Sequence, residues 1–288
     1  MSNGEVVREH LYHAEAEVLT GDLRLPLAQE IKSQASAKLP EKGGYLSQHE
    51  TDYRLEGVIA FDRAYTQTSG NPGVKPGHGW TTLVTSVLEG LNILDVVTAD
   101  RVVGQIFLEH PLKGYVPEIS FLGTRFENLR IAGHPVTVEL DLNHFGSKPE
   151  NDAPYTKSPG FLDRVSRQHE QVRKHSNLLE ALLRRYTGVS PNAKGPETVE
   201  CSLVNQAGGQ AEGQAKPGFP GDCHGHVIHI PHFGTLCLGN VRLEQSEYEA
   251  GTPKKTLIEL TMIEAHMGCI ADGKAVLGSA KGNGTTMP

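Results

Sequence analysis

The residues of this chain best able to do chemistry lie close together, in the stretch DCHGHVIHIPHFGTLC at positions 222–237. The stretch holds four of the 14 histidines and two of the 4 cysteines. Both residue types bind transition metals, as neutral imidazole and as thiolate. The apolar residues between them are equally typical of a β-strand. The stretch therefore supports two interpretations, a metal site and a buried strand that is rich in histidine.

A metal site here would depend on the spacing of two histidines. In a regular strand over residues 223–233, His224 and His226 lie on one face, about 6.5–7 Å apart, since each residue advances about 3.3 Å. The pair could then hold zinc or copper together with a third ligand from elsewhere in the chain. Candidates for that third ligand are Cys223, Asp222 and His266.

The same strand register also argues for a structural role. Ile228 and Ile230 share the face of the histidine pair, and apolar residues at alternate positions mark a core. His232 lies too far along the strand to join the pair. We therefore favour residues 224–232 as a histidine-rich buried strand, with the metal site as the alternative.

A second metal hypothesis concerns the segment DLNHFGSKPEND at positions 141–152. Asp141, Asn143 and Asp152 supply oxygen ligands of the kind that calcium prefers. The EF-hand spacing is absent, and Asp and Asn are also common in turns. The segment predicts either a calcium site or ordinary turn chemistry.

No catalytic signature accompanies these residues. The chain contains no G-x-x-x-x-G-K-[ST] phosphate loop, no G-x-S-x-G hydrolase elbow, and no G-x-G-x-x-G that follows a strand and opens a helix. We therefore expect a protein without enzymatic activity and without a cofactor, with bound zinc or copper as the alternative.

Composition narrows the class of protein further. The 288 residues carry a net charge of −7, which argues against a nucleic-acid binder with a basic face. Apolar residues make up 38% and charged residues 21%, as in globular domains, and no apolar run reaches the roughly 18–20 residues of a membrane helix. The N-terminal segment MSNGEVVREHLYHAE lacks the apolar stretch of a signal peptide. We expect a cytoplasmic protein, or a surface protein exported by a non-classical route.

Alternation of apolar and polar residues predicts an all-β fold. In HPVTVELDL, at 134–142, every second residue from Val136 to Leu142 is apolar. TLIELTMIEAH, at 256–266, repeats the alternation. Strands with one apolar face pack as an antiparallel β-sandwich. A short motif of the form [LF]-E-[GN]-[LV] recurs at 55–58, 88–91 and 126–129. This weak internal repeat makes a β-solenoid the alternative.

One long amphipathic helix is predicted as an insertion between the strands. Ser158 and Pro159 provide an N-cap and a proline at the first helical position, and no glycine or proline occurs from Phe161 to Tyr186. The predicted organisation is a β-rich part at 1–157, the helix at 158–187, a Gly-, Pro- and Gln-rich loop at 188–222, strands at 223–282 that complete the same domain, and a disordered tail at 283–288. Residues 67–79, QTSGNPGVKPGHG, are predicted to form a further loop.

Four segments together resemble a known family. They are LEGLNILDVVTADRVVGQI (88–106), RFENLRIAGHPVTVELD (125–141), HVIHIPHFGTLCLGNV (226–241) and HMGCIADGKAVLGSAKG (266–282). They are similar to the β-rich bacterial proteins called choice-of-anchor domains, which are found on cell surfaces. The resemblance implies a surface-associated β-fold and carries over no catalytic residue. It also implies that Ile230, Pro231 and Gly234 belong to a buried strand.

These features favour a non-enzymatic structural protein that assembles with copies of itself, as a homo-oligomer or as a surface or shell-type assembly. Exposed strand edges are the physical route to such assembly. Two alternatives remain open: a metal-binding protein or metalloenzyme that uses residues 224–232, and a module that binds a small ligand or carbohydrate. An aromatic content of 6%, with one tryptophan, argues against a stacking platform for sugars.

Overall fold

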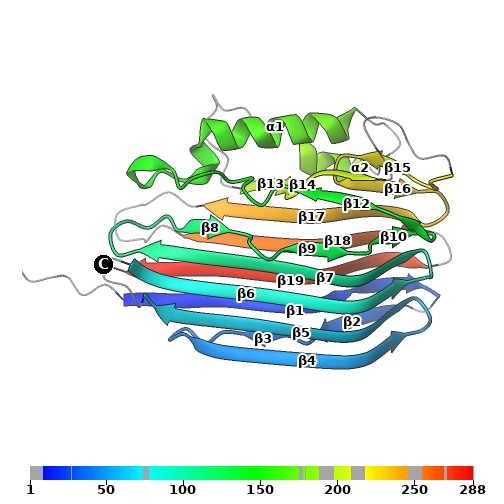
Figure 1. The fold of residues 1–288 in the computed structure, drawn as a ribbon, viewed down its shortest axis with the longest axis horizontal. Helices are drawn as coiled ribbons and strands as arrows, with labels where there is room; N and C mark the ends of the chain where they lie inside the picture. Colours follow the sequence, from blue (N-terminus) through cyan, green and yellow to red (C-terminus); the bar gives the residue numbers. More distant parts are fainter. Residues whose placement is uncertain are drawn as a thin grey trace, which may run out of the picture.

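A computed structural model describes residues 9–26, 28–73, 78–174, 178, 180–187, 198–208, 218–245, 255–268 and 271–287. These residues form two large antiparallel β-sheets with helices along one side (Figure 1). The prediction of a mostly β, antiparallel fold with one helical region is therefore confirmed. The β-solenoid finds no support, because the strands pair antiparallel within two sheets instead of coiling in a repeat. No helix among the described residues is long and apolar enough to span a membrane.

Sheet A contains nine of the described strands. Its order is β15-β16-β17-β18-β19-β1-β2, with β13 paired to β17 and β3 paired to β1. The bounds are Glu9–Leu25 (β1), Gln29–Gln34 (β2), Ala37–Lys38 (β3), Thr198–Ser202 (β13), Asp222–His224 (β15), Val227–Ile230 (β16), Gly234–Gln245 (β17), Thr256–Gly268 (β18) and Asp272–Met287 (β19).

Sheet B contains eight described strands in the order β11-β10-β7-β6-β5-β4, with β8 and β9 paired to β7. The bounds are Gly44–Leu55 (β4), Ile59–Pro72 (β5), His78–Ile93 (β6), Val97–Pro111 (β7), Glu118–Ser120 (β8), Arg125–Glu127 (β9), Arg130–Ile131 (β10) and His134–Pro135 (β11). A small separate sheet pairs β12 (Thr137–Leu140) with β14 (Val204–Gly208).

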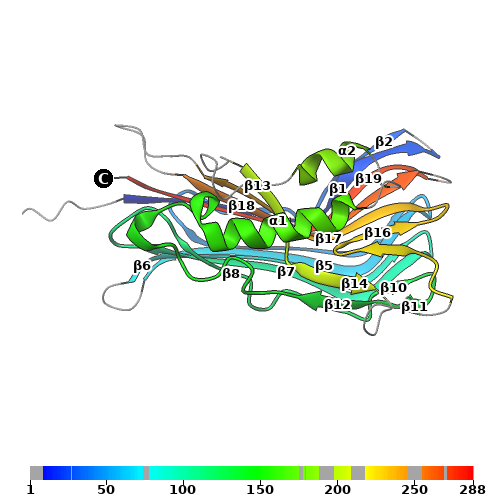
Figure 2. The same cartoon turned by 90° about the horizontal axis from the view of Figure 1, so that it is seen from above.

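The two large sheets lie face to face, with β1 and β19 of sheet A against β5, β6 and β7 of sheet B (Figure 2). Alternation along the strands produces this layering. In β1, Tyr12, Ala14 and Ala16 point inward and are buried, while His13 and Glu15 lie on the outer face. Each large apolar side chain buried between the sheets contributes about 1.5–3 kcal/mol. The inward faces of both sheets therefore hold the fold together.

The predicted helix over 158–187 is wrong in its length. Helix α1 covers Pro159–Arg173, and after it come α2 (Glu180–Leu183) and the 3-10 turn η3 (Arg184–Tyr186); two further 3-10 turns, η1 (Glu150–Asp152) and η2 (Tyr155–Lys157), precede α1. The first turns of α1 and the residues after Arg173 pack in different apolar clusters, and Val172 in the last turn of α1 joins the second of them. Phe161, Leu162 and Val165 of α1 join the main core between the sheets. Leu182 and Tyr186 pack in a second apolar cluster that includes Val172, Leu178, Val227 and Cys237.

Strand structure also extends into two segments predicted to be irregular. Strand β5 runs to Pro72 and β6 begins at His78, so most of the loop predicted at 67–79 is strand. Glycine is required at position 70 of β5, because a Cβ there would collide with the ring of Tyr12 on the facing sheet. Strand β19 runs to Met287 and pairs with β1, so the disordered tail predicted at 283–288 is wrong over 283–287.

Parts of the loop predicted at 188–222 are ordered as strands β13, β14 and the start of β15. The rest of that segment lies largely outside the described residues.

Candidate functional site

The histidine-rich segment forms a hairpin, not a single strand. Strands β15 and β16 pair antiparallel around a turn at Gly225 and His226, and Gly225 adopts a φ of +64°. This left-handed conformation is one that glycine takes without steric cost. The predicted regular strand over 223–233 is therefore wrong. His224 ends one strand and His226 lies in the turn, so the two do not share a strand face at a two-residue spacing.

His226 is fully buried and bonded to a tyrosine. Its Nε2 and the hydroxyl of Tyr186 share a hydrogen bond of 2.8 Å, and the two rings meet edge to face. Burial lowers the pKa of His226 to about 3, so the imidazole is neutral at pH 7. Across the tyrosine ring, His169 of α1 donates from Nε2 to the backbone carbonyl of Glu200 at 2.7 Å. The two histidines thus anchor η3 on the outer face of sheet A.

His266 takes part in a separate group, centred on the buried carboxylate of Glu264. The Nε2 of His266 lies 2.9 Å from that carboxylate. Arg185 donates to both its oxygens at 2.8 Å, and Lys274 contacts it at 2.7 Å. Asn240 adds a bond of 3.1 Å from its amide nitrogen.

The carboxylate oxygens of Glu264 are fully occupied by hydrogen bonds and ion pairs. Burial alone would raise the pKa of Glu264, but the bonds from His266, Arg185 and Lys274 outweigh it and hold the pKa far below its usual range. A hollow of about 360 Å³ lies beside the group, lined also by Glu200 and Arg242. Because the carboxylate oxygens already accept several strong bonds, the group suits a clamp between η3 and sheet A better than a general base.

The three described cysteines are protonated thiols at neutral pH. Cys223 is half-buried, and burial together with Asp222 raises its pKa to about 11. Cys201 and Cys237 are buried, and all three are free thiols. Cys269 lies outside the described residues. Metal binding requires the thiolate, which burial disfavours at each of these positions.

Within the described ranges, no group of three or more His, Cys, Asp or Glu side chains is placed to hold a metal ion. The zinc or copper site on His224, His226, Cys223 and His266 stays a prediction.

The carboxylates of two calcium candidates, Asp141 and Asp152, accept backbone N–H groups. Asp152 accepts the backbone N–H groups of Tyr115, at 2.9 Å, and of Val116, at 2.8 Å. Asp141 accepts the backbone N–H of Asn143 at 3.1 Å, the geometry of an Asx turn. The Asp141 contact matches the turn interpretation of the segment, whereas Asp152 bonds a backbone segment 37 residues away in sequence; calcium binding here stays a prediction.

A buried histidine pair that the sequence did not single out lies between the two sheets. His10 of β1 stacks on Trp80 of β6, and its ring centre is 4.5 Å from that of His110 on β7. His110 is 1% exposed, and neither of its ring nitrogens has a hydrogen-bond partner among the described residues. Burial is the main cause that lowers the pKa of His10 to about 4 and that of His110 to about 3. Both rings are therefore neutral at pH 7.

Strand β4 forms one edge of sheet B (Figure 1). It pairs with β5 from Gly44 to Leu55 in one unbroken register, and Asp52 within it adopts a left-handed φ of +56°. Its other side has no paired strand among the described residues, and most of its side chains are exposed on both faces. Tyr45, with 65% of its surface exposed, is one of the few exposed large apolar residues. A strand of this kind can add a further strand.

The strands at the other edges of the two large sheets are shorter than β4. The described strands that border sheets A and B elsewhere are β2, β3, β8, β9, β11, β13 and β15, and none exceeds 6 residues, whereas β4 has 12. Short edge strands are a common protection against unwanted pairing. Strand β4 lacks that protection.

Comparison with known proteins assigns a family. A model described as Domain of unknown function (DUF8256) matches residues 10–244, which is most of the chain. The chain belongs to the DUF8256 family. The DUF8256 match extends from β1 into β17 and so includes β4, α1 and the histidine hairpin. No curated protein and no solved structure matches the chain. Nothing in the DUF8256 match links the chain to choice-of-anchor domains, and that resemblance stays a prediction.

Proposed function

We propose that this DUF8256 protein is a non-enzymatic structural β-sandwich that assembles with a second copy of itself through strand β4. The observation that carries the proposal is the contrast between the long, exposed β4 and the short strands at the other borders. Unpaired backbone N–H and C=O groups along an edge strand are a template for another strand. The saturated Glu264 group and the neutral buried histidines also suit structure better than catalysis.

The chemistry of β4 points to pairing over its N-terminal half. Residues 44–49 carry no acidic side chain, whereas Glu50 and Asp52, whose backbone is left-handed, discourage a partner farther along. Two copies related by a two-fold axis place these halves antiparallel, with the same residues contributed by each copy. Because β4 is the one long edge strand among the described residues of each copy, the pairing closes at a dimer and does not continue into a fibre.

The test is a charge placed on the free edge. Ser47→Lys puts a cation in the middle of the pairing segment, on a side chain that is exposed in the single chain. Gln67→Lys is the matched control, because Gln67 lies directly opposite Ser47 on the neighbouring strand β5, one strand away from the edge. Light scattering coupled to size-exclusion chromatography measures the mass, and thermal unfolding checks the fold.

We expect a dimer for the unmodified chain and for Gln67→Lys, and a monomer with unchanged thermal stability for Ser47→Lys. A monomeric unmodified chain at all concentrations, or a Ser47→Lys variant that stays dimeric, would refute the proposal. Native mass spectrometry of the untagged protein gives the same mass and any bound metal in one spectrum. One transition-metal ion per chain would favour the metalloprotein alternative.

A further inference from the structure

A groove of about 400 Å³, which we call the α1 groove, lies between helix α1 and the small sheet of β12 and β14 (Figure 2). This volume falls in the usual range for small-molecule sites, about 300–1,000 Å³. Helix α1 forms one wall, and β12, the turn after it and β14 form the other. All of the residues that line the groove are polar or charged. The α1 groove therefore suits a ligand that is polar throughout.

The two walls of the α1 groove carry opposite charges. Arg164 and Arg167 lie one turn apart on α1. Glu139, on β12, and Asp141, in the turn after it, line the other wall. Within the described part of the chain, no ion pair joins the two walls. Opposite charges that are held apart in this way leave both walls open to a ligand that carries both signs.

The arginine wall keeps donors for an anionic group. Arg164 donates from Nε to the backbone carbonyl of His144 at 2.7 Å, which holds its guanidinium in place. Neither Arg164 nor Arg167 is paired with a carboxylate of a described residue. The planar guanidinium fork matches the two oxygens of a carboxylate. This wall therefore suits the carboxylate of a ligand.

The acidic wall offers acceptors for N–H groups. The carboxylate of Glu139 is exposed and has no partner among the residues that the structure describes. His144 is 2% exposed, and neither of its ring nitrogens has a hydrogen-bond partner there. The Asp141 carboxylate lies 3.4 Å from Nδ1, which favours the ring proton on that nitrogen and leaves Nε2 as an acceptor. A buried acceptor without a partner is unfavourable, and a ligand N–H group would satisfy it.

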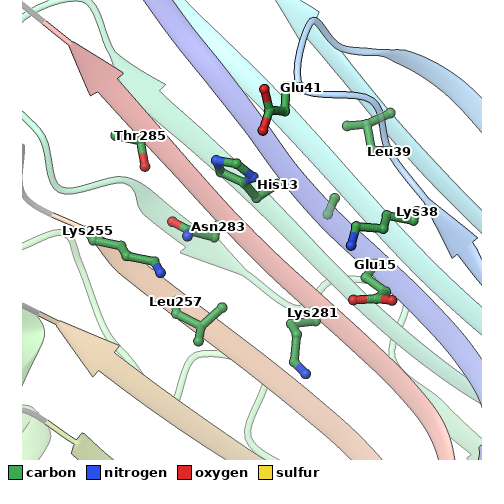
Figure 3. A pocket seen from close by; sticks show the side chains of 11 residues that line it. His13, Glu15, Lys38, Leu39, Glu41, Lys255, Leu257, Lys281, Asn283 and Thr285 are labelled. Carbon is green, nitrogen blue, oxygen red and sulfur yellow. The ribbon is translucent and has the colours of Figure 1, made fainter.

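A second hollow, on the outer face of sheet A, differs in how its charges are arranged (Figure 3). Lys281 in that hollow already forms an ion pair with Glu259 at 3.5 Å. Glu15 lies directly opposite Lys281 on one side and Lys38 on the other in the adjacent strands. Opposite charges there are neighbours, whereas the α1 groove separates them. A ligand that bridges two charges therefore fits the α1 groove better.

We propose that the α1 groove binds a polar α-amino acid in its zwitterionic form. The carboxylate accepts from the two arginines, and the ammonium donates to Glu139 and to Nε2 of His144. The amides of Gln171 and Asn205 provide donors and acceptors for a polar side chain of the ligand. One charge of each sign suits the groove better than a phosphate, whose second negative charge would face the acidic wall.

This site goes beyond the proposed dimer, because the α1 groove and β4 lie on opposite sides of the molecule in Figure 1. Isothermal titration calorimetry of the full chain tests it, with L-glutamine as the probe. Two analogues are the controls, because N-acetyl-L-glutamine lacks the ammonium and L-glutamine amide lacks the carboxylate. We expect L-glutamine to bind one per chain, and each analogue to bind at least about tenfold more weakly.

Two substitutions test the two walls separately. Arg167→Gln removes one cation, and we expect it to weaken L-glutamine by about tenfold and to narrow its advantage over the amide. Glu139→Gln removes one negative charge and should weaken L-glutamine by about fivefold, with a narrower advantage over the N-acetyl analogue. The matched control is Arg173→Gln, an exposed arginine in the last turn of α1 that does not line the groove, and it should bind as the unmodified chain does.

Absence of L-glutamine binding, equal binding of either analogue, or unchanged binding by both groove variants would each overturn the proposal. Thermal unfolding checks that the variants fold, which we expect because Arg167 and Glu139 are exposed. The monomeric Ser47→Lys variant should still bind L-glutamine, so that failure of the groove and failure of the dimer are distinguishable.

Discussion

Acid should destabilise this protein at a pH where its carboxylates are still ionised, because several histidines are buried in their neutral form. Burial lowers the pKa of His110 and His226 to about 3. Histidine in an unfolded chain titrates near pH 6.5. Below that pH the unfolded state binds protons that the folded state does not. The stability that these residues contribute is therefore complete above pH 6.5 and is lost as the pH falls toward 3.

The size of the effect follows from the difference in pKa. At pH 5, about 1.5 units below the unfolded value, each such histidine lowers the free energy of unfolding by about 2 kcal/mol relative to neutral pH, since one unit corresponds to about 1.4 kcal/mol. His110 and His226 together account for about 4 kcal/mol, a large part of the 5–15 kcal/mol typical of a folded protein. His10, whose pKa is lowered to about 4, acts in the same direction.

Urea denaturation at pH 7.5 and pH 5 measures this loss, and His110→Phe isolates one contribution. Phenylalanine keeps an aromatic ring beside His10 and Trp80 but cannot take a proton. We expect the variant to lose about 2 kcal/mol less than the unmodified chain between the two pH values. The control is His134→Phe at an exposed position, which should change the loss by less than about 0.5 kcal/mol. If His110→Phe and the unmodified chain lose the same stability, the neutral burial of His110 is refuted.

Three further predictions concern the packing around the helices and the clamp. Glu264→Gln leaves Arg185 without its buried carboxylate and should lower the free energy of unfolding, measured by urea denaturation, by about 3 kcal/mol. The control Glu259→Gln loses only a surface ion pair and should cost less than about 1 kcal/mol. Asp152→Ala removes the acceptor of two backbone N–H groups and should cost about 2 kcal/mol; a rise in thermal midpoint with added calcium in the unmodified chain alone would instead support a calcium site. Phe161→Ala empties a fully buried position stacked on Phe145 and should cost about 3–5 kcal/mol, and a loss below about 1 kcal/mol would contradict the core position of α1.

The strands could be predicted because their pattern is local. In β18, Ile258, Leu260 and Met262 are buried and Glu259 is half-buried, as the alternation predicts. Ile228 and Ile230 are buried as well, although they belong to one strand of a hairpin. The buried face of Ile228 and Ile230 could be predicted although the turn at Gly225 was not, because the face of each residue depends only on its nearest neighbours along the strand.

The site could not be predicted because it depends on contacts between distant segments. Arg185 and Glu264 are 79 residues apart in sequence, and nothing near either residue indicates the pair. The turn at Gly225 was missed because a glycine between two histidines looks like a strand position when only the spacing of histidines is considered. The edge position of β4 depends on the order of strands in sheet B, which its own residues do not encode.

The pairing of β1 with β19 has a consequence for synthesis of the chain. Strand β1 (Glu9–Leu25) is made long before its main partner in sheet A, β19 (Asp272–Met287). At about 5–20 residues per second, β1 waits on the order of 10–50 s on the ribosome before β19 emerges. During that time its inward residues Tyr12, Ala14 and Ala16 have no strand of β19 beside them. The earliest stable unit should therefore be the β4-to-β7 meander of sheet B, with sheet A closing only once β19 has been made.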